Sequence, residues 1–322
     1  MAAAEPPPPT GMGFLGLLSF RRSATAVASF DPAQDDELQV LDALQAHVAD
    51  RLAALSHQPP LLSLAFLSKL LDALLSSDDA FRDVLGIGPV AAALSRPPAD
   101  RLAADLLDRT VKTLDILNAS PTSASPGAGC GLGLALYTMS SVLVFSMWAL
   151  VAAVPCQDRA SAATNPPVAP PKQVQWAAPM SALQERISDE WRKKDKKGSS
   201  SGSAATGLLA EMQAVERAAR ELSSVLEEVA EEEEEEQLVM GVSAERAHDV
   251  VERAEALAAA CRALEEGLAP LERQVRTVFH RVVASRGEVV RIMEHSTRSN
   301  SSATANAAAA SGSGAPPHHH SF

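Results

Sequence analysis

The feature that most constrains this chain is an uncharged apolar run from Leu132 to Val154, read as LGLALYTMSSVLVFSMWALVAAV. The nearest charged residues are Asp115 upstream and Asp158 downstream. A helix rises about 1.5 Å per residue, so a run of this length can cross a hydrocarbon layer roughly 30 Å thick. The flanking sequence is more polar. The chain must therefore either bury this segment among other helices or place it in a bilayer.

Both interpretations of the central segment stay open at this point. Its length favours a membrane span, for which the candidate residues are Leu132, Phe145, Trp148 and Val154. Its small and polar residues favour the core helix of a soluble bundle. These residues are Gly133, Thr138, Ser140, Ser141 and Ser146. If the segment spans a membrane, the lysines and arginines near its two ends favour a cytoplasmic C-terminal half.

Composition indicates an all-α protein. Apolar residues make up 46% of the chain, mostly Ala and Leu, whereas aromatic residues make up only 4%. Strands are enriched in aromatic and β-branched residues, so this profile favours helices. The net charge of -12 argues against nucleic acid as a partner, because phosphate binding requires a positive surface. The three cysteines lack a CxxC spacing, which is typical of a reducing cytosol without structural zinc.

Local patterns divide the remaining chain into segments. Residues 1–30 are rich in Pro, Ala and Ser and are expected to be disordered. Residues 31–118 are predicted to hold the N-terminal helices. The proline pair at 59–60 ends the first helix, and the pair at 97–98 precedes the last. Residues 155–178 are predicted to form a Pro-rich linker, and residues 296–322 a disordered tail.

The C-terminal segment, residues 179–295, has the clearest helical periodicity. Apolar residues step by four and three along 208–229, 247–268 and 271–292, which predicts three helices with narrow heptad seams. Gly267 and Pro270 predict a tight bend or kink between the last two. Because such seams must pack against something, we predict an antiparallel helical bundle with a long apolar central helix and disordered termini and linkers.

No catalytic motif was found in the sequence. A P-loop and an HExxH pair are both absent, and the histidines outside the C-terminal tail are far apart. We therefore predict no catalytic residues, no cofactor, no metal site and no small-molecule substrate. The run Glu231 to Glu236 is expected to be a solvated acidic loop, because like charges in a block repel one another.

Two basic clusters are candidate interaction surfaces. The first ends the helix expected after the linker and could contact anionic lipid headgroups. Its residues are Trp191, Arg192, Lys193, Lys194, Lys196 and Lys197. The second lies on the last helix and could fit an acidic groove of a protein partner. Its residues are Arg273, Arg276, His280, Arg281 and Arg286. The alternative for both clusters is a solvated helix face that serves solubility alone.

Several stretches of the chain resemble the plant-specific BYPASS-related proteins, which include the ROH group. They are MWALVAAVPCQDR from Met147, LQERISDEWRKKDKK from Leu183, GLLAEMQAVER from Gly207 and GLAPLERQVRTVFHRVVASRGEV from Gly267. The N-terminal helices and RTVKTLDILNA from Arg109 agree as well. The blocks follow the family order, and the resemblance covers roughly residues 12 to 295. The chain departs from the family between Asn118 and Tyr137, where it is short and rich in Gly and Ser.

The resemblance implies an all-helical, non-catalytic regulator of plant growth and exocytosis. The implied partner is a subunit of the exocyst tethering complex, bound at the cytoplasmic face of a membrane. A single span at residues 132–154, in the endoplasmic reticulum or plasma membrane, is part of the same expectation. Two alternatives remain, namely a regulator that restrains a root-derived mobile signal and a membrane-anchored scaffold. The rival from another class is a helical enzyme that acts on a small signal metabolite, which would need a polar pocket.

Overall fold

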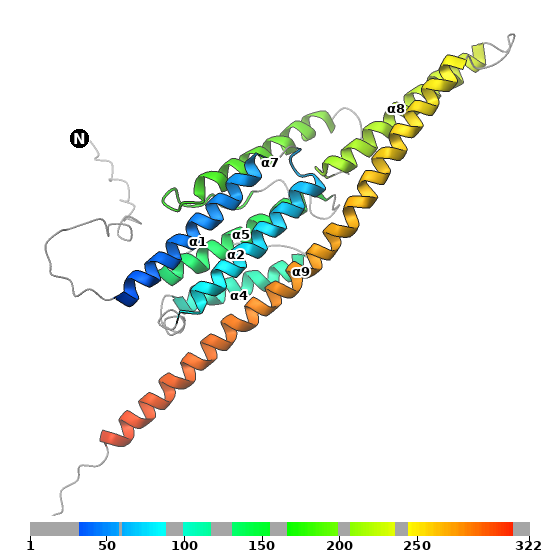
Figure 1. The fold of residues 1–322 in the computed structure, drawn as a ribbon. Helices are drawn as coiled ribbons and strands as arrows, with labels where there is room; N and C mark the ends of the chain where they lie inside the picture. The colour runs from blue at the N-terminus through cyan, green and yellow to red at the C-terminus, as the bar shows by residue number, and fades with distance from the viewer. Residues whose placement is uncertain are drawn as a thin grey trace, which may run out of the picture.

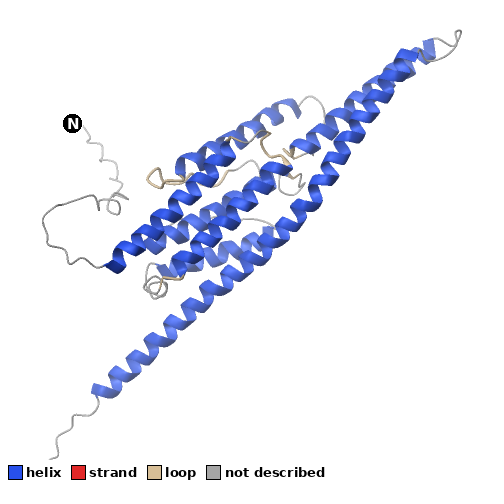
Figure 2. Cartoon of the chain, viewed as in Figure 1, coloured by secondary structure: helices blue, strands red, loops and turns tan. Residues whose placement is uncertain are grey.

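The computed structural model describes residues 32–57, 60–87, 99–116, 131–154, 166–198, 207–235 and 244–311. Within these ranges the regular secondary structure is helical, without strands (Figure 2). The helices are α1 (Pro32–Ser56), α2 (Leu64–Leu85), α4 (Ala99–Ile116), α5 (Gly131–Ala153), α7 (Ala177–Gly198), α8 (Ala210–Glu235) and α9 (Ala244–Ser311). The predicted all-α fold with one long apolar helix is confirmed. The predicted N-terminal segment 1–30 lies outside the described residues.

The helices form a bundle and a long projecting hairpin. Helices α1, α2, α4, α5 and α7 lie side by side, and α9 runs along the bundle and beyond it at both ends (Figure 1). Helix α8 pairs with the first part of α9. Ion pairs join Glu228 to Arg246 and Glu221 to Arg253. Residue numbers therefore fall along α8 in the direction in which they rise along α9. The α8–α9 pair is therefore an antiparallel hairpin that projects from the bundle.

Helix α9 is continuous where the sequence predicts a bend. It runs from Ala244 to Ser311 with Pro270 inside it, and it continues past residue 295, where the tail was expected to begin. Proline removes one backbone hydrogen bond from a helix interior. Here Leu264, Leu268, Leu271 and Val275 keep the same four- and three-residue steps through that position. Because packing of an amphipathic face supplies most helical stability, α8 on one side and α2 on the other hold the helix together.

Helix α5 is the core of the bundle. From Leu132 to Ala153 no residue is exposed, and only Val154, directly after the helix, is 46% exposed. The other candidate span residues, Leu132, Phe145 and Trp148, are all buried. Helices α1, α2 and α4 contact α5. A helix that is apolar on every face needs such neighbours on several sides, which explains why these amphipathic helices surround it.

A polar network in the core ties three elements together at Thr138 of α5. The Gln45 side-chain amide of α1 and the Trp176 indole donate hydrogen bonds to the Thr138 hydroxyl oxygen, at 2.6 Å and 3.1 Å. The hydroxyl donates in turn to the Leu134 carbonyl at 2.7 Å. The hydroxyl thus uses its proton and both lone pairs. All three side chains of this network are buried, so the network fixes the register of α1 and of the start of α7 on α5.

The C-terminal end of α5 is capped by the backbone that leads into α8. The N–H groups of Leu208 and Leu209 donate to the carbonyls of Ala152 and Ala153, at 3.1 Å and 2.9 Å. The last carbonyls of a helix have no partner within it. Since a distant part of the chain supplies these donors, the base of the hairpin is joined directly to the core helix.

The same region joins α2, α8 and α9. The Leu64 N–H at the start of α2 donates to both carboxylate oxygens of Glu211, at 3.1 Å each. Helix α9 passes Leu64 closely, because a Cβ built on Gly267 would lie 2.4 Å from the Leu64 Cδ1 atom. Gly267 therefore acts as a point of close approach between helices, and α9 continues through it.

We predict that replacing Thr138 by Val destabilises the protein by about 2 kcal/mol or more, because the buried Gln45 and Trp176 donors both lose their acceptor. Valine keeps nearly the same volume. The matched control is Ser146→Ala, because the buried Ser146 hydroxyl bonds only to the Val142 carbonyl of its own helix. Urea unfolding followed by circular dichroism measures both. Equal losses of unfolding free energy for the two variants would contradict the prediction.

Candidate interaction surfaces

The structure divides the five basic residues predicted as a partner surface. Arg273, Arg276 and His280 are exposed. Val278 is buried, and Arg276 and His280 each lie two residues from it. A step of two residues turns a helix by about 200°, so both side chains point away from the buried side. These three residues therefore occupy the side of α9 that faces away from the bundle, here called the outward face. Arg276 pairs with Glu272 at 2.6 Å, but both side chains are more than 60% exposed, so this pair adds little stability.

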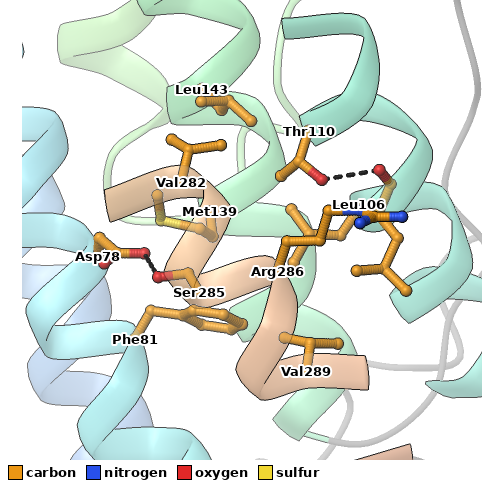
Figure 3. Close-up of a pocket in the computed structure, with 11 residues that line it drawn as sticks. Asp78, Phe81, Leu106, Thr110, Met139, Leu143, Val282, Ser285, Arg286 and Val289 are labelled. Carbon is orange, nitrogen blue, oxygen red and sulfur yellow. Dashed lines mark hydrogen bonds between the residues drawn. The ribbon is translucent and has the colours of Figure 1, made fainter. Parts of the chain in front are cut away.

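The other two basic residues lie on the bundle side of α9. The Arg281 guanidinium binds the Asp79 carboxylate of α2 and lies 3.8 Å from Asp78. Arg286 lies beside Leu106 and Thr110 of α4 (Figure 3). Arg281 therefore helps to hold α9 on the bundle, whereas Arg286 is exposed beside α4. The structure does not bring these two arginines together with the outward face.

A buried acidic residue fixes α9 to α2. Asp78 is only 3% exposed and accepts a 2.6 Å hydrogen bond from the Ser285 hydroxyl of α9 (Figure 3). Arg82 donates to the Ser285 oxygen at 3.1 Å and lies 3.3 Å from the second Asp78 oxygen. Burial raises the pKa of Asp78, while the Ser285 hydrogen bond and the charges of Arg82 and Arg281 lower it to a smaller extent. We call this group the Asp78 cluster.

A cavity of about 20 Å³ lies beside the Asp78 cluster, between α2, α4, α5 and α9 (Figure 3). Its lining includes Phe81, Met139, Leu143 and Val289. That volume holds about one water molecule, so this cavity is too small for a metabolite. Among the residues that the structure describes, no group of three or more His, Cys, Asp or Glu side chains is placed to hold a metal ion.

The basic cluster at the end of α7 is partly engaged within the protein. Trp191 is half-buried against the core, and the Lys194 ammonium donates to the Gly207 carbonyl at 2.8 Å and lies 5.9 Å from the Trp191 ring centre. Burial lowers the pKa of Lys194, which the nearby Glu216 partly opposes. Lys194 therefore holds the segment that precedes α8.

The remaining residues of this cluster differ in their environment. Arg192 and Lys193 are exposed and pair with Asp189 and Glu190 of their own helix, at 2.8 Å and 2.7 Å. The side chains of Lys196 and Lys197 lie outside the described residues. Of the candidate lipid contacts whose side chains are described, Arg192 and Lys193 are the accessible ones.

The Asp78 cluster was not found from the sequence, although a signal for it exists. Asp78 lies four residues after Leu74 and three before Phe81, both of which are buried on α2. An acidic residue at a position of the apolar stripe indicates a buried charge, and buried charges are normally paired. The partners on α9 lie about 200 residues away, so their identity requires the fold.

We predict that Asp78 makes the protein less stable as pH rises above the ordinary pKa of an aspartate, which is about 4. The folded state raises the pKa of Asp78, so it binds more protons than the unfolded state, and the free energy of unfolding falls as pH rises above this value. Asp78→Asn removes this titration. Urea unfolding at several pH values should show that the wild type loses stability relative to the Asn variant. A gain of relative stability with pH would mean that the arginines outweigh burial.

Comparison with known proteins identifies the family. The model of the ROH1-like family, described as Protein ROH1-like, matches residues 9–124 and 119–293. Protein ROH1A of Arabidopsis thaliana is 27% identical across 88% of this chain and 96% of that relative. Protein ROH1D of the same plant is 37% identical across 53% of this chain and 38% of that relative. No solved structure matches the chain. The resemblance expected from the sequence is confirmed, and the chain belongs to the ROH1-like family.

Proposed function

We propose that this chain is a non-catalytic regulatory protein of plants that binds a subunit of the exocyst complex and so modulates exocytosis and development. Membership of the ROH1-like family supports a regulatory role. The observation that carries the proposal is the outward face of α9. Arg273, Arg276 and His280 stand there on a helix that the Asp78 cluster and the core hold in place.

The outward face suits an acidic surface of a folded partner. Arginine side chains recognise carboxylates through paired hydrogen bonds, and charge complementarity mainly sets the association rate and the specificity. Arg273 and Arg276 are separated by three residues and therefore lie on adjacent turns of one helix face. A partner with two carboxylates at a similar spacing would meet both guanidinium groups at once.

The environment of α5 bears on how the protein would reach a membrane. The helix is long and apolar enough to span a bilayer, and 67% of its most apolar window is buried among other helices. Insertion into lipid would separate Thr138 from the Gln45 and Trp176 donors. We therefore favour a core helix, with membrane contact through the partner and through Arg192 and Lys193. The length of α5 favours the second candidate, a scaffold anchored by this helix.

Charge reversal on the outward face tests the partner surface. We expect Arg273→Glu with Arg276→Glu to reduce capture of the exocyst subunit by about tenfold, because two attractions become repulsions. The matched control reverses Arg192 and Lys193, which are equally exposed on α7. Pull-down with purified subunits measures capture, and circular dichroism confirms helicity. Undiminished capture by the helical α9 variant would remove the proposed surface.

Extraction from plant membranes tests the two placements of α5. The full-length protein should be released by an alkaline carbonate wash, because a core helix is not embedded in lipid. A requirement for detergent would instead show that α5 spans the bilayer. The bundle packed around α5 would then have to open, and the anchored scaffold would replace the core-helix arrangement.

A further inference from the structure

The hairpin of α8 and α9 carries apolar residues that the rest of the protein covers only in part. None of the residues from Ala210 to Glu231 is buried, and neither is any from Glu245 to Thr277. From Glu245 onward, Val278 is the first buried residue of α9. In the bundle α1, α2, α4 and α5 each pack against two or more other helices, whereas α8 packs mainly against α9. As a result Leu226 is 48% exposed and Val251 is 53% exposed.

The exposed apolar residues share one side of the hairpin. The ion pairs Glu228–Arg246 and Glu221–Arg253 bridge its other side. Leu226 precedes Glu228 by two residues and Val251 precedes Arg253 by two, and a two-residue step turns a helix by about 200°. Both apolar side chains therefore point away from the bridged side.

Small side chains continue this surface along α9. Ala254 and Ala258 follow Val251 after three and seven residues, which keeps them on its stripe, and both are exposed. We call Leu226, Val251, Ala254 and Ala258 the open side of the hairpin. Two large apolar residues flanked by alanines form a shallow strip that another helix can approach closely.

The hairpin also holds the negative charge of the protein. Residues 210–266 contain 17 Asp and Glu against five Arg and no Lys, so their net charge is -12. The remaining residues contain 23 acidic and 23 basic side chains, so they are neutral overall. Arg220, Arg246 and Arg253 already pair with glutamates of the hairpin. Glu227, beside Leu226, and Glu255, one turn after Val251, border the open side and are exposed.

We infer that the open side of the hairpin docks a basic amphipathic helix of a partner protein. The apolar face of that helix would cover Leu226 and Val251, and its flanking lysines or arginines would meet Glu227 and Glu255. A second copy of the hairpin would bring two charges of -12 together, and an anionic lipid surface would be repelled in the same way. This surface is separate from the outward face of α9 and does not depend on the proposed function.

The first test uses the full chain and two synthetic helical peptides about four heptads long. Both carry leucine at the seam positions, and one has lysine where the other has glutamate beside the seam. Fluorescence anisotropy should show that only the basic peptide binds, and more weakly at high salt. Leu226→Ser with Val251→Ser should weaken binding by about tenfold or more. The control Val283→Ser, at a residue 45% exposed on α9 beyond the hairpin, should not change binding.

A charge swap tests the inference even if the serine variant loses helicity, because it leaves Leu226 and Val251 unchanged. Glu227→Lys with Glu255→Lys should lose the basic peptide and gain the acidic one. Equal binding of both peptides by the wild type, or affinities unchanged by the swap, would overturn the inference. So would light scattering that shows a dimer abolished by Leu226→Ser, because the open side would then bind a second copy of the chain.

Discussion

The burial of α5 is the constraint on which the rest of the structure depends. An uncharged helix with no exposed residue between Leu132 and Ala153 cannot be covered by one neighbour, so the chain wraps several amphipathic helices around it. Three polar side chains of α5 are accommodated within the helix, whereas the buried Ser140 hydroxyl has no hydrogen-bond partner among the residues that the structure describes. Thr138, Ser141 and Ser146 donate to the carbonyls four residues earlier, and Thr138 alone also serves as an acceptor for other elements. The bonds to Thr138 thus fix how α1 and the start of α7 lie on α5.

Much of this fold could be predicted from the sequence, because helical periodicity and apolar length are local signals. The heptad steps indicate the helices of the C-terminal third, and the composition indicates an all-α chain. What could not be predicted depends on contacts distant in sequence. Pro270 and Gly267 indicate a break by local rules, yet packing on α8 and α2 keeps α9 continuous. Trp176 lies in a Pro-rich stretch that reads as a linker, yet it is fully buried in the core.

The arrangement of the basic residues on α9 also could not be predicted from the sequence. Five basic residues close together in the sequence of α9 indicated one surface, but a helix distributes them around its axis. Arg273, Arg276 and His280 are exposed on the outward face, Arg281 pairs with α2, and Arg286 is exposed beside α4. Only knowledge of the buried face, marked by Val278, Val282 and Val289, separates the two groups. Only Arg273, Arg276 and His280 lie on the face that we propose for a partner.

The backbone bonds between Leu208, Leu209 and the end of α5 have a mechanical consequence. Helix α9 has 68 residues, so it is a rod roughly 100 Å long that is held by the bundle near its middle. A load applied at the far end of the hairpin acts on a long arm. At the base of the hairpin, Leu208 is hydrogen-bonded to the end of α5 and Glu211 to the start of α2. Tension on the hairpin would thus be concentrated on a few hydrogen bonds at the edge of the core, and this edge is where the protein would yield first.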